Sequence, residues 1–146
     1  MSNYKTESSY FDLHTVGIGY ANRLREVKAR NASFWAVDIA ALHGSSDNVQ
    51  YTRFDCRISG KDAQAALKLV KPQIDAKQKV LVGFKISDIY PETFVYEKGD
   101  KAGQTGVVLK GRLLSVAWIK VDGSTVYTAP KDKQADSEAE ALRQAA

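Results

Sequence analysis

The chain has 146 residues, enough for one domain with a hydrophobic core but too few for two domains of ordinary size. Hydrophobic residues make up 44% of the chain and charged residues 26%, values that are typical of an ordinary soluble globular protein. The formal net charge of +4 is a mild excess, and it does not by itself imply a nucleic-acid partner.

The cysteine content and the hydropathy pattern exclude further classes. Cys56 is the one cysteine of the sequence, so it cannot form an internal disulfide and the fold needs no oxidising compartment. Its alternation with the apolar Phe54 and Ile58 predicts a buried structural thiol rather than a nucleophile. No apolar run approaches the roughly 18 residues that span a membrane, and no N-terminal stretch resembles a signal peptide. We therefore expect a cytoplasmic protein.

The run HTVGIGYANRLREVKA, residues 14–29, predicts a long first strand. Gly17 and Gly19 fall on one face of this strand, where the missing side chains allow a tight bend or the close approach of another backbone. This pair of glycines is not a phosphate-binding loop, because that motif needs a third glycine and opens a helix. Arg23 and Arg25 share a face further along the strand.

Residues 33–59 predict two strands joined by a polar turn at 44–48, because two sets of side chains alternate in both strands. The set expected to point inward comprises Trp35, Val37, Ile39, Ala41, Thr52, Phe54, Cys56 and Ile58. The set expected to point outward comprises Phe34, Asp38, Tyr51, Arg53, Asp55 and Arg57. Rings beside guanidinium groups suit a planar, anionic ligand such as single-stranded nucleic acid. An ordinary half-buried hairpin with Tyr–Arg pairs is the alternative.

The two carboxylates of this outward set need a separate explanation, because they would repel phosphate. We expect Asp38 and Asp55 to pair with Arg53 or Arg57 and to set the orientation of these guanidinium groups.

A helix is predicted to follow the second of these strands. The apolar residues recur at three- and four-residue spacing, at Ala63, Ala66, Leu67, Val70 and Ile74. Pro72 is expected to end or kink the helix near Lys71. The lysines on the remaining positions are interpreted as a solvated face rather than a binding patch: Lys61, Lys68, Lys71 and Lys77.

The C-terminal half predicts two further long strands, over 79–87 and 106–122, with a bend at Gly111. Between them we expect a protruding hairpin that carries Tyr90, Phe94, Tyr96, Lys98 and Lys101. Loops of this length within a compact domain are usually functional or disordered, and the ring content argues against disorder. Residues 125–128 are expected to add a short edge strand.

This order of elements predicts a mainly β, OB-fold-like domain over 10–129, between a flexible N-terminus (1–9) and a polar C-terminal tail (130–146). The OB-fold is a five-stranded Greek-key barrel, here with one helix between strands three and four and a long hairpin between strands four and five. Its ligands bind on strands two and three, between the first–second and fourth–fifth connections. The nucleic-acid-binding residues expected there are Arg23, Arg25, Lys28, Arg30, Phe34, Tyr51, Arg53, Arg57, Tyr90, Phe94, Tyr96, Lys98 and Lys101.

Five segments also resemble a known family: FDLHTVGIGYANRLREV, DIAALHG, RFDCRISG, VLVGFKISD and KAGQTGVVLKGRLLSVAWIKVDG. They are similar to small replication proteins of bacterial integrative conjugative elements and genomic islands, and the resemblance covers Tyr10 to Tyr127. It implies a role in replication or transfer of a mobile element and carries over no catalytic residue. More distantly, the layout is similar to bacterial single-strand DNA-binding proteins, whose stacking rings on strands two and three Phe34 and Tyr51 would mirror. The C-terminal DSEAEALRQAA departs from those proteins, because it lacks their acidic tip ending in Pro-Phe.

We therefore expect a protein that binds single-stranded DNA, with RNA as an open alternative, and that forms a dimer or tetramer. It is expected not to be an enzyme and to need no cofactor or metal, because neither His14 nor His43 lies in a cluster with metal-ligand spacing and no catalytic motif is present. A protein-interaction or assembly module of a conjugative element is the alternative function, since aromatic anchors suit protein interfaces as well as bases.

Overall fold

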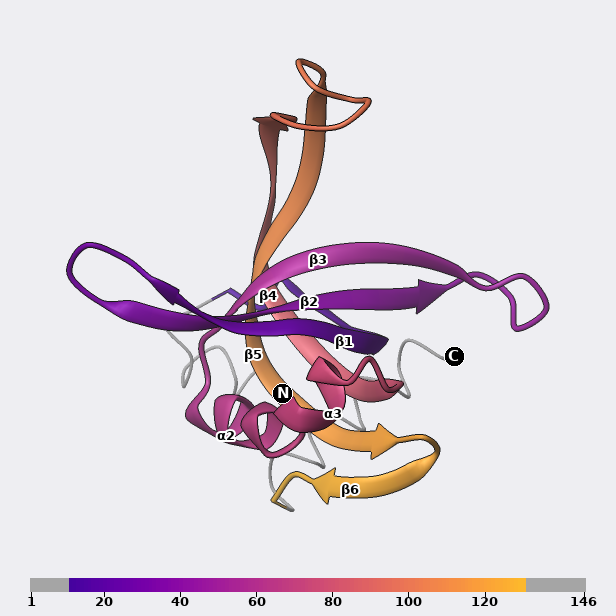
Figure 1. Cartoon of the computed structure of the whole chain (residues 1–146). Coiled ribbons are helices and arrows are strands. Elements are labelled where there is room, and N and C mark those ends of the chain that lie inside the picture. Colours follow the sequence, from indigo (N-terminus) through magenta and orange to yellow (C-terminus); the bar gives the residue numbers. More distant parts are fainter. Residues whose placement is uncertain (1–10, 131–146) are drawn as a thin grey trace.

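The computed structural model describes residues 11–130 of the chain. The expectations for residues 1–9 and for the tail from residue 131 onward lie outside this range. The helices and strands are β1 (His14–Lys28), β2 (Ser33–His43), β3 (Gln50–Ile58), α2 (Lys61–Leu69), α3 (Lys71–Asp75), β4 (Val80–Val95), β5 (Thr105–Val121) and β6 (Ser124–Thr128) (Figure 1). This order confirms the predicted succession of three strands, a helical segment and two long strands, and the predicted short final strand.

The strands form one sheet in the order β3-β2-β1-β4-β5-β6, and the protein is mainly β, as predicted. All neighbours in this order are antiparallel, whereas β3 also pairs with β5 in parallel. This additional pairing joins the two sides of the sheet, so that β1, β2, β3, β5 and β4 form a ring. The sixth strand, β6, lies outside the ring against β5.

The first strand takes part in both halves of the ring. Gly19 is opposite Ala41 of β2 and also opposite Val82 of β4. A Cβ atom at Gly19 would lie 2.7 Å from the carbonyl oxygen of Ala40 and 2.9 Å from the Cα of Ala41. Only glycine fits at this close approach of two backbones, which is the role the sequence predicted for this strip of β1.

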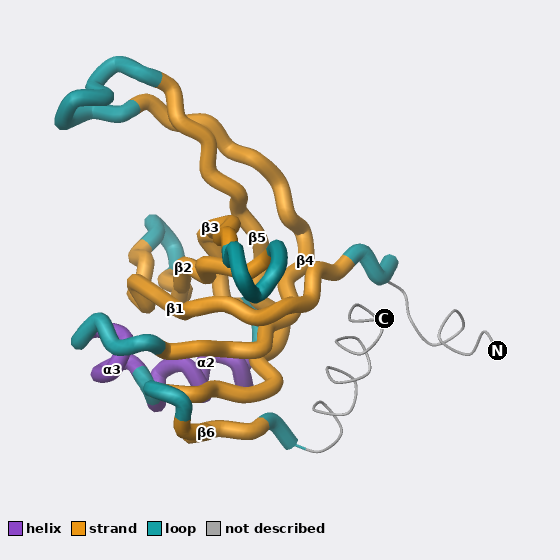
Figure 2. The backbone as a smooth tube through the Cα atoms, turned by 90° about the vertical axis from the view of Figure 1, so that its right-hand side faces the viewer, coloured by secondary structure: helices purple, strands orange, loops and turns teal. Residues whose placement is uncertain are grey.

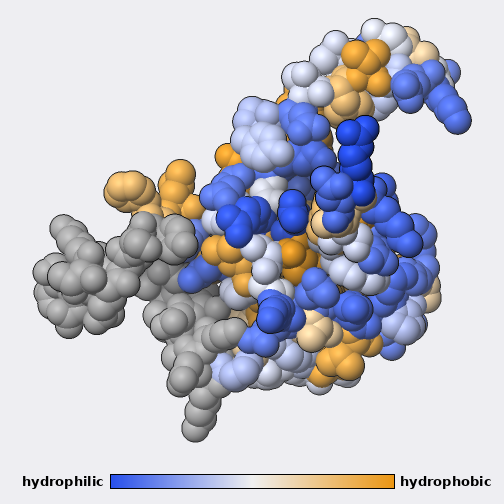
Figure 3. Space-filling model, turned by 90° about the vertical axis from the view of Figure 1, so that its left-hand side faces the viewer, coloured by the Kyte–Doolittle hydropathy of each residue, from blue (hydrophilic) through white to orange (hydrophobic). Residues whose placement is uncertain are grey.

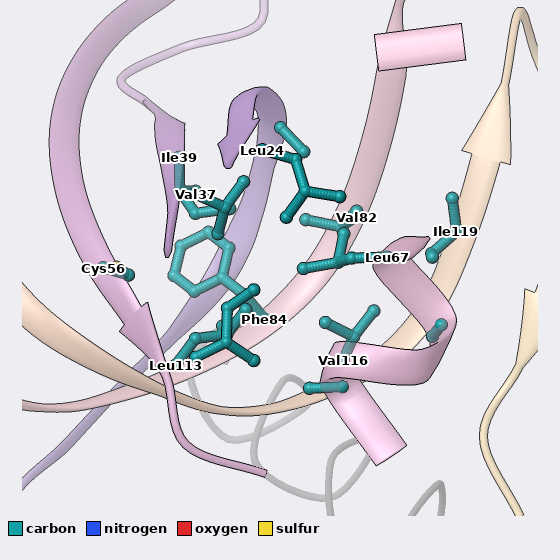
Figure 4. Close-up of a cluster of buried hydrophobic side chains, with 14 of the residues drawn as sticks. Leu24, Val37, Ile39, Cys56, Leu67, Val82, Phe84, Leu113, Val116 and Ile119 are labelled. Carbon is teal, nitrogen blue, oxygen red and sulfur yellow. The ribbon is translucent and has the colours of Figure 1, made fainter. Parts of the chain in front are cut away.

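The core lies inside the ring (Figure 4), where labelled side chains from all five strands of the ring and from α2 converge. The inward set predicted for β2 and β3 is confirmed in part, since the buried members are Val37, Ile39, Phe54, Cys56 and Ile58, whereas Trp35, Ala41 and Thr52 are only partly buried. Asp38, which alternation predicts to point outward into solvent, is only 3% exposed, because the ion pairs with Arg23 and Arg25 cover it. Burying a Val or Ile side chain contributes roughly 1.5–3 kcal/mol. Alternation of large apolar residues therefore supplies much of the free energy that closes the ring.

The two helices lie beneath the strands in Figure 1 and cover one end of the core. Every apolar position predicted for the helical segment is buried, from Ala63 to Ile74. The segment breaks at Val70, which ends α2 and precedes α3, and Pro72 stands in the first turn of α3, where its missing N–H costs little. Our placement of Lys77 on the helix face is wrong, because α3 ends at Asp75 and Lys77 adopts a positive φ of 65° in the connection to β4.

The outer halves of β4 and β5 form a ribbon that leaves the body, as predicted (Figure 1). Strand pairing continues from Tyr90 opposite Lys110 to Val95 opposite Thr105. Figure 2 shows this ribbon bending toward the side of the body on which β2 and β3 lie. We call residues 90–110 the β4–β5 hairpin.

Candidate nucleic-acid interface

The β4–β5 hairpin has one aromatic face. Phe94 lies opposite Gly106 in the strand register, and a Cβ atom at Gly106 would lie 2.6 Å from the Phe94 ring and 2.8 Å from the Tyr96 ring. Glycine at this position therefore lets both rings lie against β5. The two rings pack edge to face with their centroids 4.8 Å apart, and the ammonium group of Lys101 lies 5.5 Å from the centre of the Tyr96 ring. These contacts give the rings a defined position on an otherwise exposed ribbon.

The outer face of β2 and β3 carries the outward set that alternation predicted. Tyr51 is 57% exposed, and Arg53 and Arg57 are also exposed. The guanidinium carbon of Arg57 lies 4.4 Å from the centre of the Phe34 ring, so one face of this ring is already covered. The side chain of Arg53, in contrast, forms no hydrogen bond or ion pair with any residue in the described range.

A chain of ion pairs crosses this face from β1 to β5. Arg23 and Arg25 both bond to Asp38, with shortest N–O distances of 2.6 and 3.2 Å. Arg25 and Lys110 both bond to Asp55, at 2.8 and 2.9 Å. The expected pairing of the two carboxylates with Arg53 or Arg57 is therefore wrong, because cations from neighbouring strands occupy them.

An irregularity in β1 makes this arrangement possible. The register of β1 against β2 shifts between Asn22 and Arg25, and Arg23 has a positive φ of 50°. Both arginine side chains then reach Asp38, while Leu24 points into the core and is 3% exposed. A bulge that re-aims side chains is a recurrent feature of small sheets.

The ion pairs change the protonation equilibria of the groups that form them. Burial raises the pKa of Asp55, but the hydrogen bonds from Lys110 and Arg25 outweigh it, and the net pKa lies below its ordinary value. The hydrogen bond to Asp55 raises the pKa of Lys110, and the hydrogen bond to Asp38 raises the pKa of Arg23. All three groups therefore stay charged at neutral pH.

A groove of about 680 Å³ lies between the outer face of β3 and the aromatic face of the β4–β5 hairpin. We call it the hairpin groove. Its aromatic lining is Tyr51, Phe94 and Tyr96, and its charged lining is Arg23, Asp38, Arg53, Asp55, Glu92 and Lys110. Figure 3 shows the side of the body beneath the hairpin covered largely by hydrophilic residues, with hydrophobic and hydrophilic residues together on the hairpin.

The structure brings together some of the predicted site residues and separates others. Those that line the hairpin groove are Arg23, Tyr51, Arg53, Phe94 and Tyr96. Those that lie outside its lining are Arg25, Lys28, Arg30, Phe34, Arg57, Tyr90, Lys98 and Lys101. In this second set, Arg25 forms ion pairs with Asp38 and Asp55. Lys28 and Arg30 lie at the exposed β1–β2 connection, and Lys98 and Lys101 lie at the tip of the β4–β5 hairpin.

Sequence reasoning missed several residues of this surface. Lys110 lies in the groove and bonds to Asp55, and its alternation with Arg112 on β5 was a usable signal. Tyr20 of β1 lies next to Tyr51, with 6.4 Å between the ring centroids, and strand alternation opposite the glycines could have placed it on the outer face. Lys77 and Lys79 border the same region, but nothing in their local pattern indicates it.

A nucleophilic cysteine, a metal site and a membrane-spanning helix each have structural requirements that can be compared with residues 11–130. Cys56 is fully buried, as predicted, and burial raises the pKa of its thiol to about 12, with further contributions from Asp55 and Asp38. His43 contacts the hydroxyl group of Thr52 at 3.0 Å. No group of three His, Cys, Asp or Glu residues in this range has the geometry of a metal site. Within the same range, neither helix has the length and apolar character needed to cross a membrane.

Fold and site together define a class: a mainly β domain that carries a groove lined by aromatic and charged residues on the outside of a five-stranded ring. A family model described as a protein of unknown function (DUF3577) matches residues 4–135, and the chain belongs to this family. Comparison with curated proteins and with solved structures found no match.

Proposed function

We propose that this protein binds single-stranded DNA with little sequence preference, in the cytoplasm, during replication or transfer of a mobile element. The observation that carries the proposal is the hairpin groove, whose lining brings the rings of Tyr51, Phe94 and Tyr96 together with Arg53, whose side chain has no described partner. Bases of any identity can stack on such rings, and each stacked base contributes roughly 1–3 kcal/mol. The link to mobile elements rests on the resemblance of the sequence segments alone.

The topology supports an OB-fold assignment. The ring order β1-β2-β3-β5-β4, the parallel pairing of β3 with β5 and the helices between β3 and β4 are the features expected of that fold. OB-folds bind oligonucleotides on strands two and three beside the connection between strands four and five. The hairpin groove has this location in the chain, which favours nucleic acid over other anionic ligands.

Positive and negative charges nearly balance on the groove, and most of them are engaged in ion pairs. Three cations and two carboxylates form the ion-pair chain, so it carries a net charge of 3 − 2 = +1. Arg53 adds a further positive charge and Glu92 a negative one, so the groove together with its ion-pair chain has a net charge of 4 − 3 = +1. The paired carboxylates hold Arg25 and Lys110 in place, and the bases rather than the phosphates are expected to lie over them, because a phosphate would be repelled by Asp38 and Asp55.

A second candidate function is assembly with a protein partner, and that partner is a second copy of this chain. The observation that favours it is the opposite face of the β4–β5 hairpin, where Val95 is 58% and Val107 66% exposed. β-Branched side chains on an uncovered ribbon suit an apolar protein contact. Val95 lies outside the lining of the hairpin groove, whereas Val107 also borders the groove, so an assembly contact on this face would lie next to the proposed strand-binding surface.

The test is a titration of fluorescein-labelled oligo-dT with the full chain, followed by anisotropy at about 50 and 200 mM salt. We expect binding that weakens steeply with salt, because each neutralised phosphate releases counterions. A labelled oligo-U of the same length separates DNA from RNA. The absence of binding to any single strand at the lower salt concentration would overturn the proposal in favour of the assembly function.

The Tyr51→Ala/Arg53→Ala variant sharpens this test. Both side chains are exposed, so the thermal midpoint should stay nearly unchanged while the affinity for oligo-dT falls at least about 5-fold. Lys61→Ala/Leu69→Ala on α2 is the matched control, since it also removes one positive charge and one large exposed side chain. A loss of stability in the Tyr51 and Arg53 variant would show that the faces of β3 are assigned the wrong way round.

A further inference from the structure

A second groove adjoins the hairpin groove on the side away from the hairpin. It has a volume of about 560 Å³, and we call it the Tyr20 groove. Tyr20, Ala40, Lys77 and Lys79 line it together with Tyr51 and Arg53, which also line the hairpin groove. The two grooves therefore meet at Tyr51 and Arg53 and offer one continuous path across the outer face.

The strand register explains why this groove exists. Tyr20 of β1, Ala40 of β2 and Arg53 of β3 lie opposite one another in a single row across three strands. The small side chain of Ala40 stands between two large ones, so the row is hollow at its centre. Tyr20 and Tyr51 come from the strands on either side of β2, and their rings approach to a centroid distance of 6.4 Å, tilted by 43°.

The far wall of the Tyr20 groove is basic. Lys77 and Lys79 are exposed, and neither forms a hydrogen bond through its side chain or an ion pair with any described residue. Their backbone is nevertheless held in place, because the N–H of Lys77 bonds to the carbonyl of Ile74 and the carbonyl of Lys79 accepts from the N–H of Asp122. Two free ammonium groups on a fixed segment, opposite aromatic rings, match what a nucleic-acid strand requires: cations for phosphates and ring faces for bases.

We propose that the Tyr20 groove is a second subsite for the same nucleic-acid strand, which continues from the hairpin groove across Tyr51 and Arg53. In this subsite Tyr20 stacks on a base, and Lys77 and Lys79 bind phosphates. The inference rests on the proposed binding of single strands and adds to it a path and a dependence on strand length. A strand too short to reach the Tyr20 groove uses the hairpin groove alone.

The experiment compares labelled oligo-dT of about 4 and about 16 nucleotides, the range of site sizes known for single OB-folds. For Tyr20→Ala, we expect at least about a 5-fold loss of affinity for the longer strand and no change for the shorter one. For Lys77→Ala/Lys79→Ala, the slope of log K against log salt for the longer strand should fall in magnitude by about 1.4, the value for two phosphate contacts on a single strand.

Lys61→Ala/Lys68→Ala on α2 is the control for charge, because it removes two positive charges that line neither groove. The Lys68 ammonium group lies 4.8 Å from the centre of the Trp35 ring, so the stability of this variant is measured as well. Thermal unfolding of each variant checks the fold. Lys77→Ala/Lys79→Ala changes only exposed side chains, so its result does not depend on whether Tyr20→Ala folds. The inference is overturned if the unmodified chain binds the longer strand and the lysine variant shows the same slope. It is also overturned if Tyr20→Ala weakens both lengths equally. A failure of the unmodified chain to bind either length would instead overturn the proposed function itself.

Discussion

Asp55 places a negative charge on a surface proposed for an anionic ligand. Its two oxygens accept hydrogen bonds from Arg25 and Lys110, and its side chain is 18% exposed. A carboxylate in this position weakens the electrostatic attraction between the groove and phosphate groups. In return it fixes two cations from different strands, since a charge-assisted hydrogen bond restricts a long side chain more strongly than a neutral one does.

The stability contributed by Asp55 should depend on pH. Because its pKa in the folded protein lies below the ordinary value of 3.8, the ionised group stabilises the fold above that pH, and this contribution is lost as the pH falls through the lower, folded-state pKa. Asp55→Asn should therefore cost roughly 1–3 kcal/mol of unfolding free energy at neutral pH and less in acid. Urea denaturation at both pH values measures this difference.

Asp75→Asn is the control for this prediction. Its carboxylate pairs with Lys71 on the surface of α3 and is 53% exposed, so the loss should stay within about 0.5 kcal/mol. A cost for Asp55→Asn that is the same in acid as at neutral pH would contradict the ion-pair explanation.

At the scale of elements, the β4–β5 hairpin combines two different surfaces on one ribbon. Successive side chains of a strand point to opposite faces, so Phe94 and Val95 must lie on different sides. Phe94 lines the groove and packs on Tyr96, whereas Val95 is 58% exposed and lies outside the groove lining. A binding surface and an assembly surface can therefore be tested separately within the same element.

Substitutions at neighbouring residues of β4 should give opposite results. Phe94→Ala should weaken oligo-dT binding by about 5-fold or more, because a stacking surface is lost, and should leave the oligomeric state unchanged. Val95→Ala should leave oligo-dT binding unchanged. Anisotropy titration measures the first property and analytical ultracentrifugation the second. If Val95→Ala and not Phe94→Ala weakens binding, the assignment of the groove face is wrong.

At the scale of the whole molecule, the ring depends on β1 reaching two neighbours at once. At Gly19 the backbones of β1 and β2 approach so closely that a methyl group would meet the backbone of Ala40 and Ala41. Gly17 is on the same strand, but a methyl group there would meet only the end of the Phe84 ring, at 3.2 Å. Backbone atoms of a paired strand cannot move aside without loss of their hydrogen bonds, whereas a ring can shift by a few tenths of an ångström.

Gly19→Ala should therefore destabilise the protein more than Gly17→Ala does. We expect a loss of roughly 1–3 kcal/mol or more for Gly19→Ala, which is the usual cost of overpacking, and a smaller loss for Gly17→Ala. Thermal and urea unfolding of both variants measure the order. Equal stability of the two variants would mean that the close approach at Gly19 does not limit the ring.

Local patterns predicted most of the elements and the two faces of β2 and β3. The alternation through Phe54, Cys56 and Ile58 and the helical spacing from Ala63 to Ile74 depend only on which residues are near in sequence, and burial confirmed both. The break of the helical segment at Val70, just before Pro72, and the turn after His43 follow from backbone chemistry of the same local kind. The sequence by itself thus determined a mainly β chain with one helical segment and a protruding hairpin.

Only the tertiary structure decided which side chains meet on the outer face. Asp55 and Lys110 are 55 residues apart and become partners because β3 pairs with β5 in parallel, a register that no local pattern encodes. The meeting of Tyr20 with Tyr51, and of both with Lys77, likewise depends on where three separate elements pack. Sequence alternation predicts that a side chain points outward. The residues that surround it on the outer face are set by strand register and ring closure, which depend on the packing of the whole core.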